Sequence, residues 1–575
     1  MATTLLSNAF NLRRVREDHS NLPCSARNGR VGLRNKADAD HRHRRLGRHR
    51  ERRAGCLSGS PVRLLGLDHV HGPGQRGHDR RNVPHAWFTN SRTADRNLAS
   101  KAHGQVVRWG IAIALLAAAA CAGGTAQNTI AITHVSVIDV ASGATRPDNT
   151  VLVTGNRITY AGPAASAKIP SGATVVDGRG KFLIPGLWDM HVHGFVWVFS
   201  EFAGPLMIAN GVTGARDMGW YIDTTLRWRS DIAAGREIGP RLVAGARVDG
   251  AVNKARFVAH VVTEEDGVRA VDTLARRKDG SRRADFIKTY SWVPRAAYFG
   301  IAREAKKLGV PFAGHVPYSV SVIEASDAGE RSIEHEDDLM RACTSRDSLL
   351  RARFGDTTSA GSDQLDMIKA QARLIRAFYD PARCKSVIAT LARNHTWVTP
   401  TLVVYQPYAH AFDSASTHPE WSKYVPGLVQ GGWLHKSARV TPADSMVVRS
   451  YFSFDRTRDL KDAGVKLLAG TDMPQAFVYP GFSLHEELEL LVRSGLTPLE
   501  ALRAATYNPA EFLGALDSLG TVTQGKVADL VLLDANPLTN IRNTRRISAV
   551  IANGRLFDRA ARAQLLKRVE TALKH

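Results

Sequence analysis

Six side chains of metal-binding types each follow a short apolar run in the central part of this 575-residue chain. The first two, at positions 191 and 193, end the run 182–193. Successive side chains of a β-strand point to opposite faces, so these two imidazoles point the same way and can bind one ion. Four imidazoles, a carboxylate and a lysine brought together predict a hydrolytic two-metal site. The six residues are His191, His193, Lys288, His315, His335 and Asp472.

The His-x-His spacing is weak evidence by itself, because a chain with 21 histidines contains such pairs by chance. Two other pairs occur, His41 with His43 and His69 with His71. Both lie in sequence rich in Arg and Gly without a strand pattern, and we interpret them as accidental. The pair at 191 and 193 differs, because an apolar run precedes it and four potential partners follow at other strand ends.

Much of the net charge of +23 lies in residues 1–105, which hold 21 Lys and Arg against 8 Asp and Glu. The remaining residues hold 56 against 46. A nucleic-acid-binding arm and a disordered leader are two interpretations of this segment. A third fits better, in which residues 1–105 precede the true start of translation. We therefore predict a disordered or mistranslated leader at 1–105 and no nucleic-acid partner.

Residues 106–127 are typical of an export signal, with a charged start, an apolar core and small residues at the exit. The apolar core, 111–120, is too short to cross a membrane, which takes about 20 residues. Cys121 follows three alanines and resembles a lipoprotein attachment cysteine, although Ala118 stands where Leu is usual. We predict a periplasmic or secreted protein without a membrane span, with a lipid anchor at Cys121 as an open alternative.

Two of the five cysteines, Cys343 and Cys384, follow the signal region, so the sequence predicts no disulfide framework. A single bridge between them is compatible with an oxidising periplasm. With 44% hydrophobic and 23% charged residues, the composition is that of a globular protein. The length allows a barrel-sized domain and a smaller one.

The two flanks of the body, 128–184 and 516–565, alternate apolar and polar residues as β-strands do. They predict one small composite β-sandwich, with the central domain 185–515 inserted in it. The centre alternates short apolar runs with helical stretches, which is typical of βαβ units. Eight runs, ending near 193, 216, 246, 290, 315, 335, 402 and 472, predict an α/β fold of the (β/α)8 TIM-barrel type, with the active site at the strand ends.

Seven motifs of this chain resemble the metal-dependent amidohydrolase superfamily, in particular its imidazolonepropionase-like and Xaa-Pro or Xaa-Arg dipeptidase-like branch. They lie at 185–193, 211–219, 284–290, 313–317, 332–336, 468–474 and 505–510, and the segment 520–534 also fits. The resemblance covers about residues 129–560 and implies a metal-bearing barrel with a composite β-sandwich. One departure is the segment 244–251, where many relatives are rich in Gly and His. That segment lines the pocket in the family, so the departure bears on the substrate.

The resemblance also implies a role for each of the six residues. The pair at 191 and 193 holds the more buried of two divalent ions with Asp472, and the histidines at 315 and 335 hold the second. Lys288, carboxylated on its amine by CO2, bridges the two ions, for which Zn²⁺ is expected; iron, manganese or cobalt could occupy the same ligands. An unmodified Lys288 paired with a carboxylate is the alternative.

The implied reaction is hydrolysis of an amide or peptide C–N bond in a small molecule, with dipeptides or N-acyl amino acids as the expected substrates. The ions lower the pKa of a bridging water so that hydroxide attacks, and Asp472 carries the proton to the leaving nitrogen. Tyr290, two residues past Lys288 on the same strand face, is the second catalytic candidate. It could donate a hydrogen bond to the oxyanion or to a substrate carboxylate, or pack beneath a loop.

Two other functions compete with this interpretation. A hydrolase or deaminase of a cyclic amide or imine is the nearer alternative, but deaminases of the superfamily usually use one metal and lack a lysine where Lys288 stands. A non-enzymatic binding protein is the weaker alternative, because the ligand set is complete. His485, after the eighth strand, is interpreted as a packing residue rather than a catalytic one. The sequence carries no indication of the oligomeric state.

Overall fold

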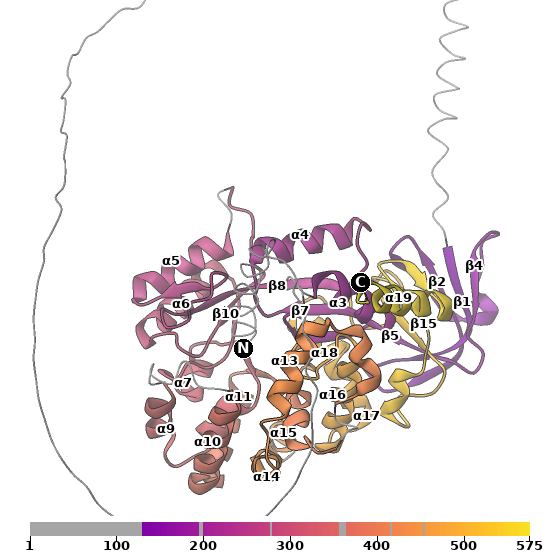
Figure 1. The fold of residues 1–575 in the computed structure, drawn as a ribbon. Helices are drawn as coiled ribbons and strands as arrows, with labels where there is room; N and C mark the ends of the chain where they lie inside the picture. The colour runs from indigo at the N-terminus through magenta and orange to yellow at the C-terminus, as the bar shows by residue number, and fades with distance from the viewer. Residues whose placement is uncertain are drawn as a thin grey trace, which may run out of the picture. The chain divides into compact units, whose positions relative to one another are not determined.

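The computed structural model describes residues 129–194, 199–276, 279–355, 364–413, 417–451 and 455–574, which belong to one compact unit of the chain (Figure 1). The predicted leader, the export signal and Cys121 lie outside the described residues. Within the described residues, no helix is both long enough and apolar enough to cross a membrane.

The two flanks of the chain build one mixed sheet, in the order β16-β15-β14-β5-β1-β2-β3, with β4 also paired to β1. Alternation along the strands turns apolar side chains such as Ile132, Leu183 and Leu530 onto a common core. β5 from the N-terminal flank pairs with β14 from the C-terminal flank, so the complete sheet requires both ends of the body. Its strands are β1 (Thr129–Ile138), β2 (Thr145–Thr154), β3 (Arg157–Pro163), β4 (Thr174–Asp177), β5 (Phe182–Pro185), β14 (Leu530–Leu533), β15 (Ile547–Ala552) and β16 (Arg555–Phe557).

The centre forms a second sheet of parallel strands, in the order β6-β7-β8-β10-β11-β12-β13, to which β9 adds beside β8. Residues 467–473 close this sheet into a barrel, because Leu467 bridges to Val398 of β13 and Met473 bridges to Val192 of β6. This closing segment thus occupies the place of the eighth strand of the barrel, between β13 and β6. The strands are β6 (Leu187–Val192), β7 (Val212–Asp217), β8 (Arg241–Gly250), β9 (Ala259–Val261), β10 (Phe286–Thr289), β11 (Phe312–Gly314), β12 (Ser332–Glu334) and β13 (Trp397–Thr399).

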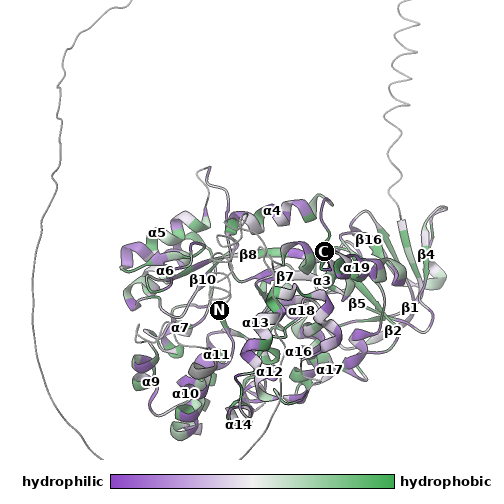
Figure 2. Ribbon diagram, viewed as in Figure 1, coloured by the Kyte–Doolittle hydropathy of each residue, from purple (hydrophilic) through white to green (hydrophobic). Residues whose placement is uncertain are grey.

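Helices follow the barrel strands, and the local sequence determines where several of them begin. A capping box of Thr263 and Asp266 begins α5, and Ser321 with Glu324 begins α7 in the same way. Figure 2 shows hydrophobic residues along β1 and β8, whereas α4, α5 and α10 alternate hydrophobic and hydrophilic residues. The first helices are α3 (Ser200–Ala209), α4 (Ile222–Ala233), α5 (Glu264–Ala275), α6 (Arg295–Leu308) and α7 (Val322–Asp327).

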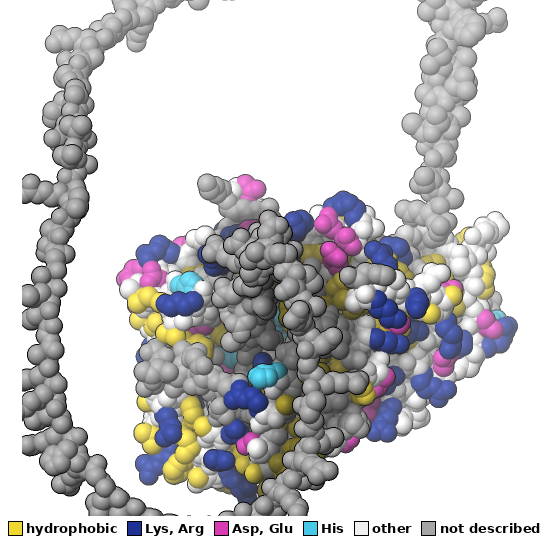
Figure 3. Space-filling model, viewed as in Figure 1, with side chains coloured by type: hydrophobic (Ala, Val, Ile, Leu, Met, Phe, Trp, Pro, Cys, Tyr) yellow, Lys and Arg dark blue, Asp and Glu magenta, His cyan; other side chains and the backbone are white. Residues whose placement is uncertain are grey.

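The long connections after β12 and β13 contain helices of their own. They are α8 (Asp337–Ala342), α9 (Asp347–Phe354), α10 (Gln364–Phe378) and α11 (Pro381–Arg393), then α12 (Gln406–Ala409), α13 (Gly427–Ser437), α14 (Pro442–Tyr451) and α15 (Asp455–Asp462). The remaining helices are α16 (Phe482–Arg493), α17 (Pro498–Ala504), α18 (Tyr507–Phe512) and α19 (Arg559–Ala572). On the face drawn in Figure 3, basic and acidic side chains are interspersed.

The predicted fold class is confirmed: the chain forms a near-closed parallel barrel of the TIM type and a separate mixed sheet from its two flanks. Within the C-terminal flank, the stretch 547–557 folds into two strands, β15 and β16. They join at Asn553 and Gly554, whose φ angles of 48° and 76° suit a tight hairpin turn. Asn-Gly is the dipeptide that such turns favour.

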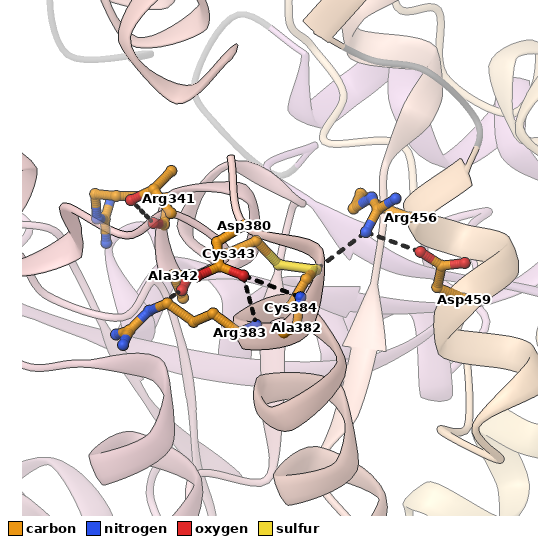
Figure 4. The surroundings of a disulfide bond; sticks show 10 residues. Arg341, Ala342, Cys343, Asp380, Ala382, Arg383, Cys384, Arg456 and Asp459 are labelled. Carbon is orange, nitrogen blue, oxygen red and sulfur yellow. Dashed lines mark hydrogen bonds and ion pairs between the residues drawn. A yellow bond between two sulfur atoms is a disulfide. The ribbon is translucent and has the colours of Figure 1, made fainter. Parts of the chain in front are cut away.

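Cys343, which follows α8, and Cys384, in α11, form a disulfide across 41 residues (Figure 4). The carboxylate of Asp380 accepts hydrogen bonds from the amides at 382 and 383 and so begins α11. Nη1 of Arg456 donates to Sγ of Cys384 at 3.0 Å. The disulfide that the sequence allowed but did not predict is therefore present. It links the end of α8 to α11 within the connection after β12.

Gly470 lies in the closing segment, where the backbone passes close to its neighbours. A Cβ atom at this position would lie 2.6 Å from Cγ2 of Thr399 and 2.8 Å from Cβ of His191. Both distances are shorter than van der Waals contact in a close-packed interior. A larger side chain would therefore push apart the strands on either side of the closing segment.

We predict that Gly470→Ala lowers the melting temperature, because overpacking of this kind costs about 1–3 kcal/mol. The matched control is Gly431→Ala in α13, where an added Cβ meets nothing within 4 Å. That change should leave the melting temperature unchanged or raise it, since alanine favours a helix by about 0.5–1 kcal/mol over glycine. Calorimetry compares the variants, and an unchanged melting temperature for Gly470→Ala would contradict the tight closure.

Candidate metal centre

Parallel strands end at a common edge of a barrel, and the six predicted metal-site residues lie at this edge. Five of them are buried, and His315 is partly buried. The fold thus gathers side chains from distant parts of the sequence. His191 is in β6, His193 just after β6, Lys288 in β10, His315 after β11, His335 after β12 and Asp472 in the closing segment.

Asp472 is the centre of this group. Its Oδ1 lies 3.4 Å from Nε2 of His191 and 3.3 Å from Nε2 of His193. One ligand atom from each of these three residues lies within 4.8 Å of the others, which is close enough for all three to hold one metal ion. Oδ2 of Asp472 lies 3.9 Å from Nε2 of His335, so the carboxylate also faces a third imidazole.

In two of these histidines, the other ring nitrogen, Nδ1, lies within hydrogen-bond distance of a protein side chain. Nδ1 of His191 lies 2.8 Å from Oε2 of Glu334, and Nδ1 of His335 lies 2.6 Å from Oγ1 of Thr401. A metal-binding histidine usually hydrogen-bonds through one ring nitrogen while the other binds the ion. In both residues Nε2 is the nitrogen left for an ion, and Nε2 of His191 is buried without a hydrogen-bond partner.

His315 extends the cluster beyond His335. The ring centroid of His315 lies 4.9 Å from that of His335 and 4.4 Å from that of Tyr290. Nδ1 of His315 lies 3.3 Å from Oγ of Ser291, which again leaves Nε2 for a ligand. The structure therefore brings the predicted second pair of histidines together and places Tyr290 beside them.

Lys288 contributes an amine without a partner. Its Nζ is buried and accepts or donates no hydrogen bond in the described structure. Burial lowers the pKa of Lys288 to about 7, although the negative charge of Glu334 opposes this effect in part. A large share of the amine is therefore uncharged at neutral pH and has a lone pair available for reaction.

Three of the imidazoles, those of His193, His315 and His335, favour the neutral form, and the carboxylate of Asp472 favours the ionised form. Burial lowers the pKa of His193 and of His335 to about 3, and holds the pKa of His315 well below its usual value. Burial acts to raise the pKa of Asp472, but the neighbouring imidazoles, first that of His191, outweigh it and hold this pKa well below its usual value. These are the protonation states in which imidazole and carboxylate bind metal, so the donor set fits a divalent ion.

Glu334 carries a buried negative charge that Arg216 balances. Nη2 of Arg216 lies 2.7 Å from Oε1 and 2.8 Å from Oε2 of Glu334, and its Nε donates to the carbonyl of Met190. Burial acts to raise the pKa of Glu334, but Arg216 and then His191 outweigh it, so this pKa lies well below its usual range. Glu334 thus remains ionised and keeps the His191 ring in one orientation.

Asp189 holds the turn that presents Asp472. Its carboxylate accepts hydrogen bonds from the amide and the hydroxyl of Thr471, at 3.0 and 2.7 Å. The φ angle of Asp472 is 56° and that of His335 is 70°, in the left-handed region that non-glycine residues rarely adopt. Such conformations cost about 1–3 kcal/mol and persist where neighbouring contacts hold them. Asp189 provides such contacts next to Asp472.

Asp189, Arg216 and Glu334 are not among the residues that the sequence predicts for the site. A signal for Asp189 is present, because residues 189, 191 and 193 share one face of a strand. Arg216 and Glu334 are opposite charges inside apolar strands, where charged residues are rare unless they are paired. That rule predicts that each of these charges forms an ion pair, but it does not identify the residue with which it does so.

His485 lies outside the cluster. Its Nδ1 lies 3.0 Å from Oγ1 of Thr544, and its Nε2 lies 3.0 Å from the carbonyl oxygen of Asn210. Both ring nitrogens are therefore used in contacts between α16 and neighbouring segments, which agrees with the packing role expected from the sequence.

Comparisons with known proteins agree with this geometry. The profile of the Amidohydrolase family matches residues 182–557. An adenine deaminase of Rubrobacter xylanophilus is 21% identical over 443 residues, which cover 76% of this chain and 59% of that protein. The chain thus spans about three-fifths or less of the length of the curated relatives that it matches first.

Two solved structures share the fold. The bottromycin amidohydrolase has a TM-score of 0.59 and 23% identity, covering 77% of this chain and 90% of that one. A Xaa-Pro dipeptidase with bound methionine in the active site has a TM-score of 0.53 and 20% identity, covering 75% of this chain and 100% of that one. At these identities the likeness concerns the fold alone.

We predict that Glu334→Gln weakens metal binding about 10- to 100-fold, the usual effect of removing a group that orients a ligand histidine. The neutral amide cannot balance Arg216, so the orientation of His191 is lost with the charge. The matched control is Glu330→Gln, since burial raises the pKa of Glu330 to about 8 and its carboxyl is already largely neutral at pH 7. Chelator competition measures both affinities, and equal losses in the two variants would contradict the role given to Glu334.

Proposed function

This chain belongs to the amidohydrolase family, and we propose that it is a metal-dependent hydrolase that cleaves the C–N bond of dipeptides or N-acyl amino acids. The observation that carries the proposal is the convergence of His191, His193 and Asp472 at the strand ends, with the buried amine of Lys288, which forms no hydrogen bond, at the same end of the barrel. A neutral amine buried among metal-binding side chains has no evident structural purpose, since it forms no hydrogen bond.

We propose two divalent ions, with Zn²⁺ the best match to imidazole and carboxylate ligands. His191, His193 and Asp472 would hold one ion, and the histidines at 315 and 335 the other. The neutral amine of Lys288 would add to CO2, forming a carbamate and releasing one proton, and this anion would bridge the two cations. When bound, the ions would acidify a water molecule and polarise the scissile carbonyl.

Asp472 would move the proton in this reaction. Its low pKa keeps it ionised at neutral pH, so it can accept a proton from the attacking water. It would then deliver this proton to the leaving nitrogen, because an amine departs readily only once it is protonated. Burial raises the pKa of Tyr290 to about 12, so its hydroxyl stays protonated and could donate a hydrogen bond to the developing oxyanion.

A deaminase is the second candidate, favoured by the similarity to an adenine deaminase. Both reactions add water to a carbon that carries nitrogen, so the histidines and Asp472 fit either one. Lys288 separates the two candidates, because deaminases of the superfamily usually bind one ion without such a lysine.

We further propose that the protein acts in the periplasm or outside the cell. The buried bridge between Cys343 and Cys384 supports this location, because disulfides persist in oxidising compartments and are rare in the cytosol. The export-like segment at 106–127 supports it as well, and attachment through Cys121 would add a lipid anchor.

We predict that the zinc-loaded protein hydrolyses members of a library of dipeptides and N-acetyl amino acids, and that removal of the metal with a chelator abolishes the activity. The assay detects the released amino group. Adenine and cyclic amides are included as competing substrates. Release of ammonia from adenine, with no cleavage of any dipeptide or N-acetyl amino acid, would favour the deaminase.

Asp472→Asn should lower kcat about 10²- to 10⁴-fold, the usual contribution of a general acid–base group. Asparagine keeps the size and one oxygen ligand, so metal content should fall little. KM should change less than kcat, because the proton transfer takes place in the transition state. Elemental analysis accompanies the kinetics, and a near-normal kcat with metal bound would show that another group carries the proton.

A further inference from the structure

Arg247, in β8, is a buried arginine that forms no ion pair with a carboxylate of the described residues. Three arginines of the described residues are buried, and the other two are paired, Arg216 with Glu334 and Arg341 with Asp338. Arg247 is only 3% exposed, yet it forms no ion pair with any residue that the structure describes. Arg247 is thus a buried cation that could bind an anion.

Arg247 lies next to the candidate metal centre. It stands opposite Lys288 in the register of β8 and β10, so both side chains point into the same end of the barrel. Its Cζ lies 4.6 Å from the ring centroid of Tyr290 and 5.4 Å from that of Phe257. Nη2 lies 3.3 Å from Nδ1 of His193. Two aromatic rings therefore hold the guanidinium beside a predicted metal ligand.

Most of the donors of Arg247 are unused. Nε and Nη1 are buried without a hydrogen-bond partner. Stacking on aromatic rings offsets only part of the cost of burying a charge, and an unpaired buried ion is strongly unfavourable. The guanidinium presents its donors as a planar fork that matches the two oxygens of a carboxylate. A carboxylate is therefore the chemical group that this position lacks.

The nearest acid along the strand already has other partners. Oδ1 of Asp249 accepts hydrogen bonds from the amides of Gly250 and Trp292, both at 2.9 Å. Its Oδ2 accepts one from the side chain of Asn253, also at 2.9 Å. Asp249 thus fixes the end of β8 to the loop after β10, and its oxygens form no hydrogen bond or ion pair with Arg247. Burial raises the pKa of Asp249, and the nearby charge of Arg247 opposes this only in small part.

We propose that Arg247 binds the α-carboxylate of the substrate and so selects amides whose leaving group is a free amino acid. This inference rests on the proposed function and names the substrate class of the same site. An α-carboxylate is two bonds from the amide nitrogen, so a carboxylate at Arg247 keeps the scissile bond close to His193 and Asp472.

Metal binding would leave Arg247 freer for this role. Nδ1 of His193 accepts a hydrogen bond from Arg247 only while the ring carries its proton on Nε2. A histidine that binds an ion through Nε2 carries its proton on Nδ1 and cannot accept there. Nη2 would then join Nε and Nη1 as a donor available to the substrate.

The test measures the binding of L-amino acids and of the matching L-amino alcohols, which lack the carboxylate and cannot be hydrolysed. Calorimetry with the zinc-loaded wild type should show the acids binding about 10- to 100-fold more tightly, the range expected for hydrogen bonds to a charged group. Arg247→Met should remove this preference, and Arg247→Lys should retain part of it. Arg331→Met is the matched control, because Arg331 also stacks on an aromatic ring, that of Phe512, but lies before β12.

Two results would overturn the proposal. The first is a wild type that binds amino acids and amino alcohols equally. The second is an Arg247→Met variant that retains its metal and its melting temperature and still binds the acids more tightly than the alcohols. In that case the ion alone would bind the carboxylate. With a cleaved dipeptide, Arg247→Met should raise KM about 10- to 100-fold and change kcat less. A fall in kcat at unchanged KM would instead assign Arg247 to the oxyanion and also overturn it. If no amide in the library is cleaved, the proposed function fails, while calorimetry still decides the role of Arg247.

Discussion

The ion pair between Arg216 and Glu334 supports the whole candidate site. Both side chains are buried inside the barrel, where neither charge would be tolerated without the other. The pair joins β7 to β12, and through Nδ1 of His191 it reaches β6. Because Glu334 stays ionised, the His191 ring is held with Nε2 towards Asp472. One buried interaction thus links three strands of the barrel to the orientation of a candidate metal-binding histidine.

The candidate ligands could be predicted because their positions follow from simple periodicity. Alternation within a strand placed His191 and His193 on one face, and the rule that parallel strands end at a common edge brought the other candidates to the same place. The groups that hold these ligands could not be predicted in this way. The contacts of Thr401 with His335 and of Ser291 with His315 depend on which strands are neighbours and on distances of a few ångströms, which the order of residues does not specify.

Two buried arginines of the same barrel differ in whether a carboxylate forms an ion pair with them. We relate this difference to two roles, one structural and one in substrate recognition. Arg216 is fully paired with Glu334, so its contribution is to orient His191 through that carboxylate. Arg247 lies beside the ligands, stacked on Tyr290 and without a carboxylate partner. Glu334 already neutralises the charge of Arg216, whereas the charge of Arg247 is neutralised only when an anion binds. The paired charge therefore relates to the reaction of the site, and the unpaired charge to its choice of substrate.

The central claim is that the cluster holds two ions bridged by a modified lysine. Anomalous diffraction from crystals of the zinc-loaded protein, collected on both sides of the zinc absorption edge, tests it most directly. We expect two zinc peaks, one beside His191, His193 and Asp472 and one beside the histidines at 315 and 335, with added density on Nζ of Lys288 between them. A single peak at the first position, with an unmodified Lys288, would contradict the account.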